Sequence, residues 1–364
     1  MKFETKHIQN RLNALRELLD EKQLDAVLLT SRENNRYFAH FSGTTSICLV
    51  TPKVSRIYVD SRYLEQAKTQ CAPVEAILVK NPLTEMAEDV KKLGVKKMGL
   101  EDQDLSWATF QKIQSLLPEV VFAGHYEDIS RLRWVKDAYE LEQLTLAAKL
   151  ADDAFSDLLK VIKPGMKETE VAAYLEHHMR QNGASGPSFD AIVASGYRSA
   201  MPHGVASEKV IEEGDPVTID FGCIYNGYCS DTTRTIFVGT PREEEMVQIY
   251  HVVLDAQLAG VEQIHAGMKG CEGDKIARDI IEVAGYGERF GHSLGHSTGL
   301  LIHEAPNLAP SSQMVLPEGA MITVEPGIYV PGLGGVRIED SCVVRKDHLD
   351  PLNRTPKEMI VVGA

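Results

Sequence analysis

Two aspartates, Asp220 and Asp231, lie in a stretch that predicts a tight β-hairpin with both carboxylates on one face. The segments 217–222 and 228–238 are rich in β-branched and aromatic residues, and Asn226-Gly227 between them is a strong signal for a two-residue turn. Because side chains alternate along a strand, such a turn makes the two aspartates diagonal neighbours, roughly 7–8 Å apart at the backbone.

The same turn fixes the pairing of the two strands, with Tyr225 opposite Tyr228 and Asp220 opposite Thr233. Two carboxylates side by side repel each other unless a proton or a cation lies between them. A solvated polar face is the alternative interpretation of such a pair. The apolar residues of the first strand indicate that it is buried, and burial favours one or two divalent metal ions.

Three histidines, His292, His296 and His303, lie within a glycine-rich segment, 290–306. A glycine at every fourth position argues against a helix and indicates backbone that passes close to another group. The helical zinc-protease motif HExxH is absent from this segment. A single core histidine is usually only hydrogen-bonded, but three in one buried loop indicate a functional site.

Two further carboxylates occupy strand-like segments later in the sequence. Glu325 ends the apolar segment 321–325, and Glu339 lies with Arg337 in the segment 336–344. Because side chains alternate between the two faces of a strand, Arg337 and Glu339 lie on the same face. An acid in a buried strand is costly unless a cation accompanies it. A simple Arg337–Glu339 ion pair and a metal ligand are therefore the two interpretations of Glu339.

Together, the acids of these strands form an oxygen-rich donor set with histidines nearby: Asp220, Asp231, Glu325 and Glu339. Such a set suits Mn²⁺, Co²⁺ or Fe²⁺ and argues against a structural zinc ion, which prefers cysteine and histidine. Four negative charges balance two divalent ions. Two ions about 3.5–4 Å apart can share a water molecule and lower its pKa, which makes hydroxide available at neutral pH.

The elements that must position these residues follow a helix-then-strand order in the second half of the chain. Apolar residues at a 3-4 spacing between 141 and 158 predict a long helix that ends by Pro164-Gly165. The other expected elements, besides the hairpin, are helices at 168–181, 243–264 and 274–284 and strands at 191–194, 321–325 and 336–344. This order, with mostly antiparallel strands, predicts an α+β domain.

Strands and helices alternate through the first third of the chain, which predicts an α/β domain. We find no cluster of converging ionisable residues there. The pattern changes near Trp134, and we place the two domains at residues 1–127 and 128–364. The length is sufficient for two domains that each have a core.

The composition excludes several classes of protein. The net charge is 38 − 52 = −14, so binding to nucleic acid or to an anionic membrane is not the first hypothesis. No apolar run approaches the roughly 18 residues of a membrane span, and the first ten residues lack the apolar core of a signal peptide. The six cysteines are scattered without a CxxC motif, so we expect buried thiols and a cytoplasmic location.

Several motifs resemble those of the pita-bread metallopeptidases, in particular the branch of Xaa-Pro aminopeptidases and Xaa-Pro dipeptidases (prolidases). They are VTIDFG, YCSDTTRT, GHSTGLLIHE, TVEPGIY and GGVRIEDS, in the order and spacing of that family. The resemblance implies an α/β, creatinase-like N-terminal domain, to about Tyr126, followed by an α+β pita-bread catalytic domain.

The resemblance also implies a metal-ligand set: Asp220, Asp231, His296, Glu325 and Glu339. By family analogy, Asp231 and Glu339 bridge two ions and Asp220 binds one of them. His296 and Glu325 bind the other ion. Glu325 is further implied to carry a proton from the bridging water to the leaving nitrogen of proline.

Five further residues match family positions around the substrate. His203, in the sequence MPHG, corresponds to a histidine that steadies the substrate near the metal ions. His303 corresponds to one that supports the oxyanion formed from the scissile carbonyl. His292 matches a residue lining the proline pocket, and Tyr329 and Arg337 match supporting residues around it.

The implied function is hydrolysis of the N-terminal Xaa-Pro bond of short proline-containing peptides by a metal-bridged hydroxide. The implied cofactor is a pair of Mn²⁺ ions, with Co²⁺, Fe²⁺ or Zn²⁺ as alternatives, and the implied assembly is a homodimer without a nucleic-acid or membrane partner. The segment Asp60–Tyr63 favours an aminopeptidase. The alternative is a prolidase that cleaves only dipeptides. Metal-free, creatinase-like hydrolysis and a pure binding role are disfavoured because all five ligand positions are kept.

Overall fold

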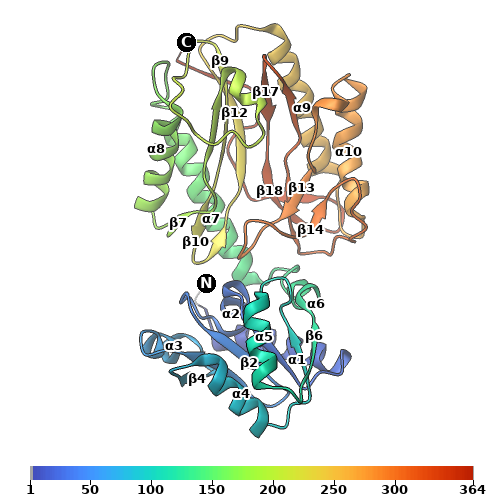
Figure 1. The fold of residues 1–364 in the computed structure, drawn as a ribbon. Helices are drawn as coiled ribbons and strands as arrows, with labels where there is room; N and C mark the ends of the chain where they lie inside the picture. Colours follow the sequence, from blue (N-terminus) through green and yellow to red (C-terminus); the bar gives the residue numbers. More distant parts are fainter. Residues whose placement is uncertain (1–2, 364) are drawn as a thin grey trace. The chain divides into compact units, whose positions relative to one another are not determined.

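The structure, a computed structural model, describes residues 3–363, which divide into two compact units between Arg133 and Trp134. Each unit has its own sheets and helices (Figure 1). The division follows the change of pattern near Trp134. The boundary after residue 127 stays a prediction of where the domains would separate as folding units.

The first unit is a six-stranded mixed sheet with helices, as the alternating pattern predicts. Its strands are ordered β4-β3-β2-β1-β5-β6, and β3/β4, β1/β5 and β5/β6 are parallel pairs. The sequence analysis missed α2, β6 and α6. The elements are α1 (Thr5–Glu21), β1 (Ala26–Leu29), α2 (Arg32–Ala39), β2 (Ile47–Val50), β3 (Ser55–Val59), α3 (Leu64–Gln70), β4 (Glu75–Leu78), α4 (Pro82–Lys92), β5 (Lys97–Leu100), α5 (Trp107–Leu116), β6 (Val121–Gly124) and α6 (Tyr126–Arg131).

A buried carboxylate in this unit was not foreseen. Glu101 directly follows β5 and is fully buried. It accepts hydrogen bonds from Ser31 N at 2.9 Å and Ser31 Oγ at 2.6 Å, and the Asn34 amide also donates to it. Arg133 in turn donates to the side-chain oxygen Oδ1 of Asn34. Hydrogen-bond donors satisfy this acid, so it fastens the start of α2 to the sheet and needs no ligand.

The second unit carries the remaining elements, with five small sheets and two pairs of helices. They are α7 (Ala138–Leu158), α8 (Glu168–Gln181), β7 (Gly186–Pro187), β8 (Ile192–Ser195), η1 (Gly196–Ala200), β9 (Asp215–Phe221), β10 (Cys223–Tyr225), β11 (Tyr228–Cys229), β12 (Thr232–Val238), α9 (Glu244–Gln263), α10 (Gly270–Val283), η2 (Gly287–Arg289), β13 (Gly295–Ser297), β14 (Glu304–Leu308), β15 (Met321–Val324), β16 (Gly327–Val330), β17 (Gly334–Arg337), β18 (Asp340–Val344), β19 (Leu349–Pro351) and β20 (Ile360–Val362).

Each pair of helices in the second unit packs on its own group of strands. Helices α7 and α8 pack on the strands β8, β10 and β11, whereas α9 and α10 pack on β14, β17 and β19 (Figure 1). Val217, Ile219 and Phe221 of β9 belong to the core under α7 and α8. Ile322 and Val336 belong to the core under α9 and α10. The two groups of strands meet between β9 and β17, and this arrangement confirms the expected α+β pita-bread fold.

The hairpin has the predicted register. Asp220 pairs with Thr233, and Tyr225 pairs with Tyr228. Asn226 and Gly227 both have positive φ angles, 46° and 83°, as a type I′ turn requires. Two expected strands are each interrupted, however, because the ladder breaks at Gly222 and at Ser230-Asp231. A Cβ atom on Gly222 would lie 1.9 Å from the carbonyl oxygen of Ser230, so the two chains cross too closely there for any side chain.

Two other predicted elements differ from the structure. The strand expected at 336–344 is divided into β17 and β18, because the chain turns at Ile338-Glu339. The glycine-rich segment 290–306, expected as a loop, contains β13 and part of β14, which pair in antiparallel fashion. A Cβ atom on Gly295 would lie 1.9 Å from the carbonyl oxygen of Thr323, so glycine allows β13 to approach β15 closely.

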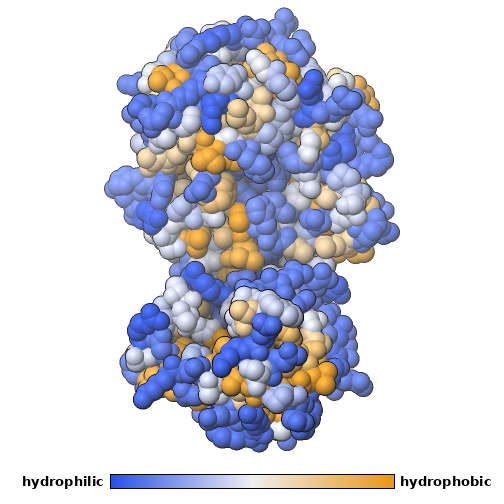
Figure 2. All heavy atoms as spheres, viewed as in Figure 1, coloured by the Kyte–Doolittle hydropathy of each residue, from blue (hydrophilic) through white to orange (hydrophobic). Residues whose placement is uncertain are grey.

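Among residues 3–363, no helix combines the length and apolar character needed to cross a membrane. Hydrophilic residues cover most of the face shown in Figure 2, and apolar residues form scattered groups on it. The six cysteines are free thiols; five are buried and Cys271 is partly exposed. The expectation of unpaired thiols is confirmed.

Candidate metal centre

A cavity of about 350 Å³ in the second unit brings together nearly all the residues singled out in the sequence. Tyr329 is not part of its wall but contacts two residues that are. The predicted residues that line the cavity are His203, Asp220, Asp231, His292, His296, His303, Glu325, Arg337 and Glu339.

Four separate strand ends supply the carboxylates. Asp220 lies in β9, and Asp231 directly precedes β12. Glu325 directly follows β15, and Glu339 lies in the turn between β17 and β18. The hairpin contributes two acids because its register places both on one face, as the Asn226-Gly227 turn predicts. The break between β17 and β18 lets the backbone N–H of Glu339 donate to the Thr233 carbonyl at 3.0 Å.

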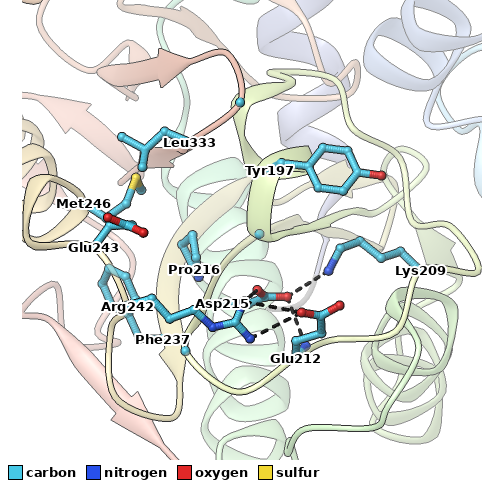
Figure 3. A pocket seen from close by; sticks show the side chains of 13 residues that line it. Tyr197, Lys209, Glu212, Asp215, Pro216, Phe237, Arg242, Glu243, Met246 and Leu333 are labelled. Atoms are coloured by element: carbon cyan, nitrogen blue, oxygen red, sulfur yellow. Dashed lines mark hydrogen bonds and ion pairs between the residues drawn. The ribbon is translucent and has the colours of Figure 1, made fainter.

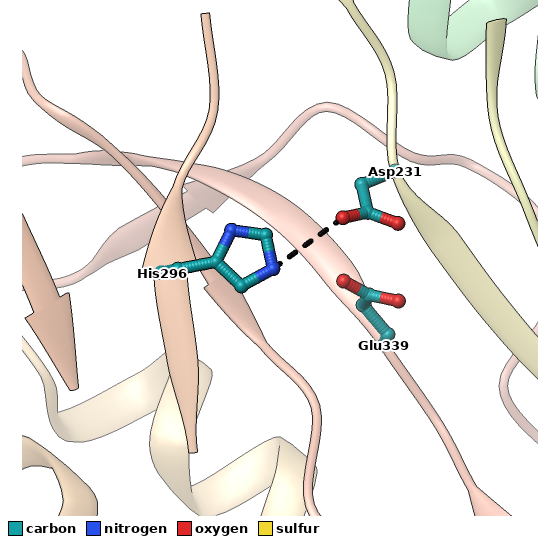
Figure 4. A group of neighbouring side chains, drawn as sticks. All are labelled: Asp231, His296 and Glu339. Carbon is teal, nitrogen blue, oxygen red and sulfur yellow. Dashed lines mark ion pairs between the residues drawn. The ribbon is translucent and has the colours of Figure 1, made fainter. Parts of the chain in front are cut away.

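The tightest cluster consists of Asp231, His296 and Glu339 (Figure 4). One potential ligand atom from each residue lies within 4.8 Å of the others, which is the geometry of a shared cation site. His296 Nε2 is also 3.4 Å from Glu325 Oε1 and 3.6 Å from Asp231 Oδ2. The imidazole therefore points at carboxylates from two different strands.

Two carboxylate oxygens in the cavity are buried without a hydrogen-bond partner: Asp220 Oδ1 and Glu339 Oε1. The second oxygen of each acid is satisfied, Glu339 Oε2 by Thr233 Oγ1 at 2.7 Å and Asp220 Oδ2 by Arg337 Nη2 at 2.6 Å. Arg337 therefore pairs with Asp220, and the alternative Arg337–Glu339 ion pair is wrong. Buried acceptors without donors are rare and costly, so these oxygens call for cations.

His296 is held in the tautomer that a metal ligand needs. Its Nδ1 atom lies 3.1 Å from the carbonyl oxygen of Ser297, which accepts a hydrogen bond only if Nδ1 carries the proton. The Nε2 lone pair then faces Asp231 and Glu325. Burial, with a smaller effect from His303, lowers the pKa of His296 to about 4, so the ring is neutral at pH 7.

The acids have raised pKa values because burial and their mutual repulsion disfavour the charged forms. Burial is the main cause of the raised pKa of Glu325, about 8. Burial followed by repulsion from Asp220 raises the pKa of Asp231, and burial followed by repulsion from Asp231 raises that of Glu339. Without cations, the cavity would hold protons at neutral pH.

A chain of hydrogen bonds links three residues on the predicted substrate side. Arg337 Nη1 donates to the hydroxyl of Tyr329 at 2.8 Å, and that hydroxyl lies 2.9 Å from His292 Nε2. His292 Nδ1 lies 2.8 Å from the Ser293 carbonyl oxygen, so the Nδ1 proton points there and Nε2 accepts from Tyr329. Burial lowers the pKa of His292 to about 4. The site therefore presents a neutral, fixed imidazole.

The other two predicted histidines are exposed on the cavity wall. The ring of His303 packs edge-on against His296, with 4.4 Å between ring centroids, and partial burial lowers its pKa. His203 lies in the turn that follows η1. Both rings can therefore contact a molecule that enters the cavity.

A second cavity, of about 270 Å³, has a different character (Figure 3). Lys209 Nζ pairs with Asp215 Oδ2 at 2.8 Å, and Arg242 lies 3.3 Å from Glu212. In the part of the chain that the structure describes, no side chain lining this cavity has a buried polar atom without a partner. Its charges are balanced internally, so the unsatisfied acceptors of the first cavity distinguish the metal centre.

Comparison with known proteins agrees with this geometry. Residues 142–346 match Metallopeptidase family M24, and residues 11–135 match the Creatinase/Prolidase N-terminal domain. The chain belongs to metallopeptidase family M24. The predicted resemblance and the two-part fold are thereby confirmed.

The M24 peptidase is similar along almost its whole length to proteins that act on Xaa-Pro bonds. A structure of the Xaa-Pro dipeptidase from Bacillus anthracis is 46% identical, covers 98% of this chain and 100% of its own, and has a TM-score of 0.95. The X-Pro aminopeptidase from Thermotoga maritima is 38% identical over 97% of this chain and 100% of its own, with a TM-score of 0.90. The Xaa-Pro dipeptidase of Pyrococcus horikoshii is 39% identical over 97% of this chain and 99% of the relative.

Family membership implies divalent metal ions, and the residues of this M24 peptidase fit them. The donor set is four carboxylates and one neutral imidazole, three of these groups converge on one point, and two carboxylate oxygens are buried without a donor. Hard, oxygen-rich ligands of this kind suit Mn²⁺ and similar ions.

Removal of the metal ions from the M24 peptidase is expected to make its stability fall as pH rises. Burial raises the pKa of Glu325 from 4.5 to about 8. Between these values the folded state holds a proton that the unfolded state has lost, so stability is greatest at low pH and declines through pH 8. The melting temperature of chelator-treated protein should fall by on the order of 5 °C from pH 6 to pH 9. Metal-loaded protein is the control, and a rise over this range in the stripped protein would contradict the assignment.

Two threonines that orient the predicted ligands carry no role in the sequence prediction. Thr233 Oγ1 donates to Glu339, and Thr323 Oγ1 lies 3.2 Å from Glu325 Oε1 while it accepts from His296 N at 3.0 Å. Each threonine lies two positions from a predicted ligand that flanks its strand. That alternation is the signal that could have identified them.

Proposed function

We propose that this chain is an Xaa-Pro aminopeptidase, which removes the first residue of short peptides whose second residue is proline. The observation that carries the proposal is the convergence of Asp231, His296 and Glu339 at a cavity lined by all the other predicted residues except Tyr329. The names of relatives similar over nearly the whole chain support the choice of the Xaa-Pro bond.

In this proposal the ligand set is the one the sequence implies. Asp220, Asp231, His296, Glu325 and Glu339 would hold the divalent ions, with Asp231 and Glu339 shared between them. When bound, the divalent ions act as Lewis acids that lower the pKa of water and polarise a carbonyl group. The mutual closeness of Asp231, His296 and Glu339 supports this set, and the buried Oδ1 atom of Asp220, which has no hydrogen-bond partner, supports the inclusion of Asp220.

Glu325 acts as the proton carrier in this proposal. The nitrogen of the scissile bond must receive a proton before proline can leave, because it would otherwise depart as a strongly basic amide anion. Glu325 lines the cavity beside His296, with 3.4 Å between His296 Nε2 and Glu325 Oε1, so its carboxylate lies where such a proton would be transferred. The hydrogen bond with Thr323 at 3.2 Å fixes one of its oxygens.

The histidines orient the peptide. His203 and His303 are exposed to the cavity, and we assign them to the scissile carbonyl region, where an N–H donor can stabilise developing negative charge. His292, held by Tyr329 and Arg337, lines the space for the proline ring. A rigid pocket that accommodates the proline ring can select peptides with proline second, because proline is the only residue whose peptide nitrogen is part of a ring.

A dipeptidase that cleaves only Xaa-Pro dipeptides is the second candidate. The names of two similar proteins, from Bacillus anthracis and Pyrococcus horikoshii, favour it. The segment Asp60–Tyr63 favours the aminopeptidase, and there Asp60 accepts from the backbone N–H of Arg62 at 2.8 Å. The two candidates share the metal centre and differ in the peptide length they accept.

The cleavage of a panel of peptides by the Mn²⁺-treated protein tests both candidates. Ala-Pro, Ala-Pro-Ala and longer Ala-Pro peptides are compared with Ala-Ala-Ala. We expect release of alanine from every peptide with proline second, at least about 10²-fold faster than from Ala-Ala-Ala, because the cavity fits the ring. Activity on Ala-Pro alone would select the dipeptidase. The absence of cleavage at every Xaa-Pro bond would refute both candidates.

Three finer points belong to the proposal. We assign Mn²⁺ as the ion because the donors are mostly carboxylates. Elemental analysis of protein purified without chelators would identify it. A homodimer and a cytoplasmic location remain predictions, which light scattering and cell fractionation test.

A further inference from the structure

Glu168, the first residue of α8, lies outside the cavity but is bonded to the segment that forms one cavity wall. Its carboxylate is fully buried. It accepts hydrogen bonds from Ser195 N and Oγ at 2.8 and 2.9 Å and from Ser207 N and Oγ at 3.0 and 2.7 Å. Arg198 donates to it as well. One carboxylate thus fastens both ends of the segment 195–207.

His203 lies within this fastened segment, and the carbonyl groups on either side of it are each held by an arginine. Arg198 Nη2 donates to the Val205 carbonyl at 3.0 Å. Arg337 Nη1 donates to the Pro202 carbonyl at 3.0 Å. Within residues 3–363, the imidazole of His203 makes no hydrogen bond of its own. The backbone bonds of its neighbours therefore determine where the ring lies.

We propose that the Glu168–Arg198 pair positions His203 for the reaction. The inference rests on the proposed function, in which His203 contacts the substrate. Glu168 orients the guanidinium of Arg198, and Arg198 holds the backbone after His203. Without Arg198, the Val205 carbonyl loses its side-chain donor, and the turn keeps the bond at Pro202 and main-chain bonds such as Val205 N to the His203 carbonyl at 2.9 Å. A reacting group displaced by about 1 Å can lose up to 10²-fold in rate.

Arg198 can be removed without removing the buried network. Glu168 keeps its four bonds from Ser195 and Ser207 when Arg198 is replaced. The Arg198 side chain is only 15% exposed, and methionine is chosen because its long, flexible side chain fills most of the space that arginine leaves. We expect this variant to fold, to bind metal as the wild type does, and to show kcat on Ala-Pro-Ala reduced about 10-fold.

A double-mutant cycle tests whether Arg198 acts through His203. His203→Ala is expected to lower kcat about 10²-fold. If Arg198 acts through His203, Arg198→Met should cause no further loss in the His203→Ala background. A full, multiplicative loss in the double variant would overturn the proposal. Failure of the wild type to cleave any Xaa-Pro peptide would instead refute the proposed function.

Two further variants sharpen the test. Arg198→Lys can still pair with Glu168 but cannot also reach Val205, so we expect kcat to stay reduced about 10-fold. Full activity in Arg198→Lys would contradict a role through the Val205 carbonyl. The matched control is Glu208→Gln, which breaks the exposed pair with Lys167 near the same segment and should leave kcat unchanged.

Discussion

Asp231→Asn is expected to abolish peptidase activity, with kcat/KM reduced by at least about 10³-fold, or about 4 kcal/mol of transition-state stabilisation. Asp231 belongs to the tight cluster with His296 and Glu339, so loss of its charge weakens the place where ligands from three segments converge. An amide has nearly the same shape as the carboxylate but carries no charge, and it binds divalent cations poorly.

Metal content and activity are measured together for this variant. We expect fewer than two metal ions per chain by elemental analysis. The control is Asp279→Asn on α10, where the aspartate is half exposed and pairs only with Lys275. That variant should keep its metal and its rate. An Asp231→Asn protein with two ions and full turnover would refute the ligand assignment.

Arg337→Met is expected to destabilise the metal-free protein by about 3–5 kcal/mol, the usual cost of leaving one partner of a buried ion pair alone. Arg337 and Asp220 are 2.6 Å apart, with side-chain exposures of 3% and 12%. Loss of the guanidinium also frees the Tyr329 hydroxyl and the Pro202 carbonyl from their donor.

Urea unfolding of metal-free and metal-loaded protein measures this effect. The destabilisation should be smaller with metal ions bound, because a cation then accompanies Asp220. Arg345→Met is the control, since Arg345 and Asp350 are 41% and 39% exposed and such pairs contribute about 0–1 kcal/mol. Equal effects for the two arginines would mean that burial does not set the strength of the Arg337–Asp220 pair.

The sequence predicted which proposed ligands would lie together because local rules determine their positions. The Asn226-Gly227 turn permits one register, and that register alone places Asp220 and Asp231 on the same face. The glycine-rich segment indicated a close backbone approach, and Gly295 makes such an approach to Thr323. Family resemblance then assigned the role of each residue, which spacing alone does not do.

Local sequence rules do not predict which residues form hydrogen bonds and ion pairs with the residues of the site. Arg337 and Glu339 share the same strand pattern, yet Arg337 reaches across to Asp220, 117 positions earlier in the chain. Glu101 and Glu168 look like ordinary acids beside a strand or at a helix start. Their donors come from segments 27 to 71 positions away, and such pairings depend on the packing of whole elements.

The interruption of the strand at Glu339 has a consequence for how the enzyme is made. Asp220, the first proposed ligand, precedes Glu339 by 339 − 220 = 119 positions, and the backbone N–H of Glu339 reaches Thr233 where the cluster closes. A chain still growing on the ribosome has no Glu339 until translation passes that codon. On the proposed ligand assignment, the metal centre therefore closes only late in synthesis.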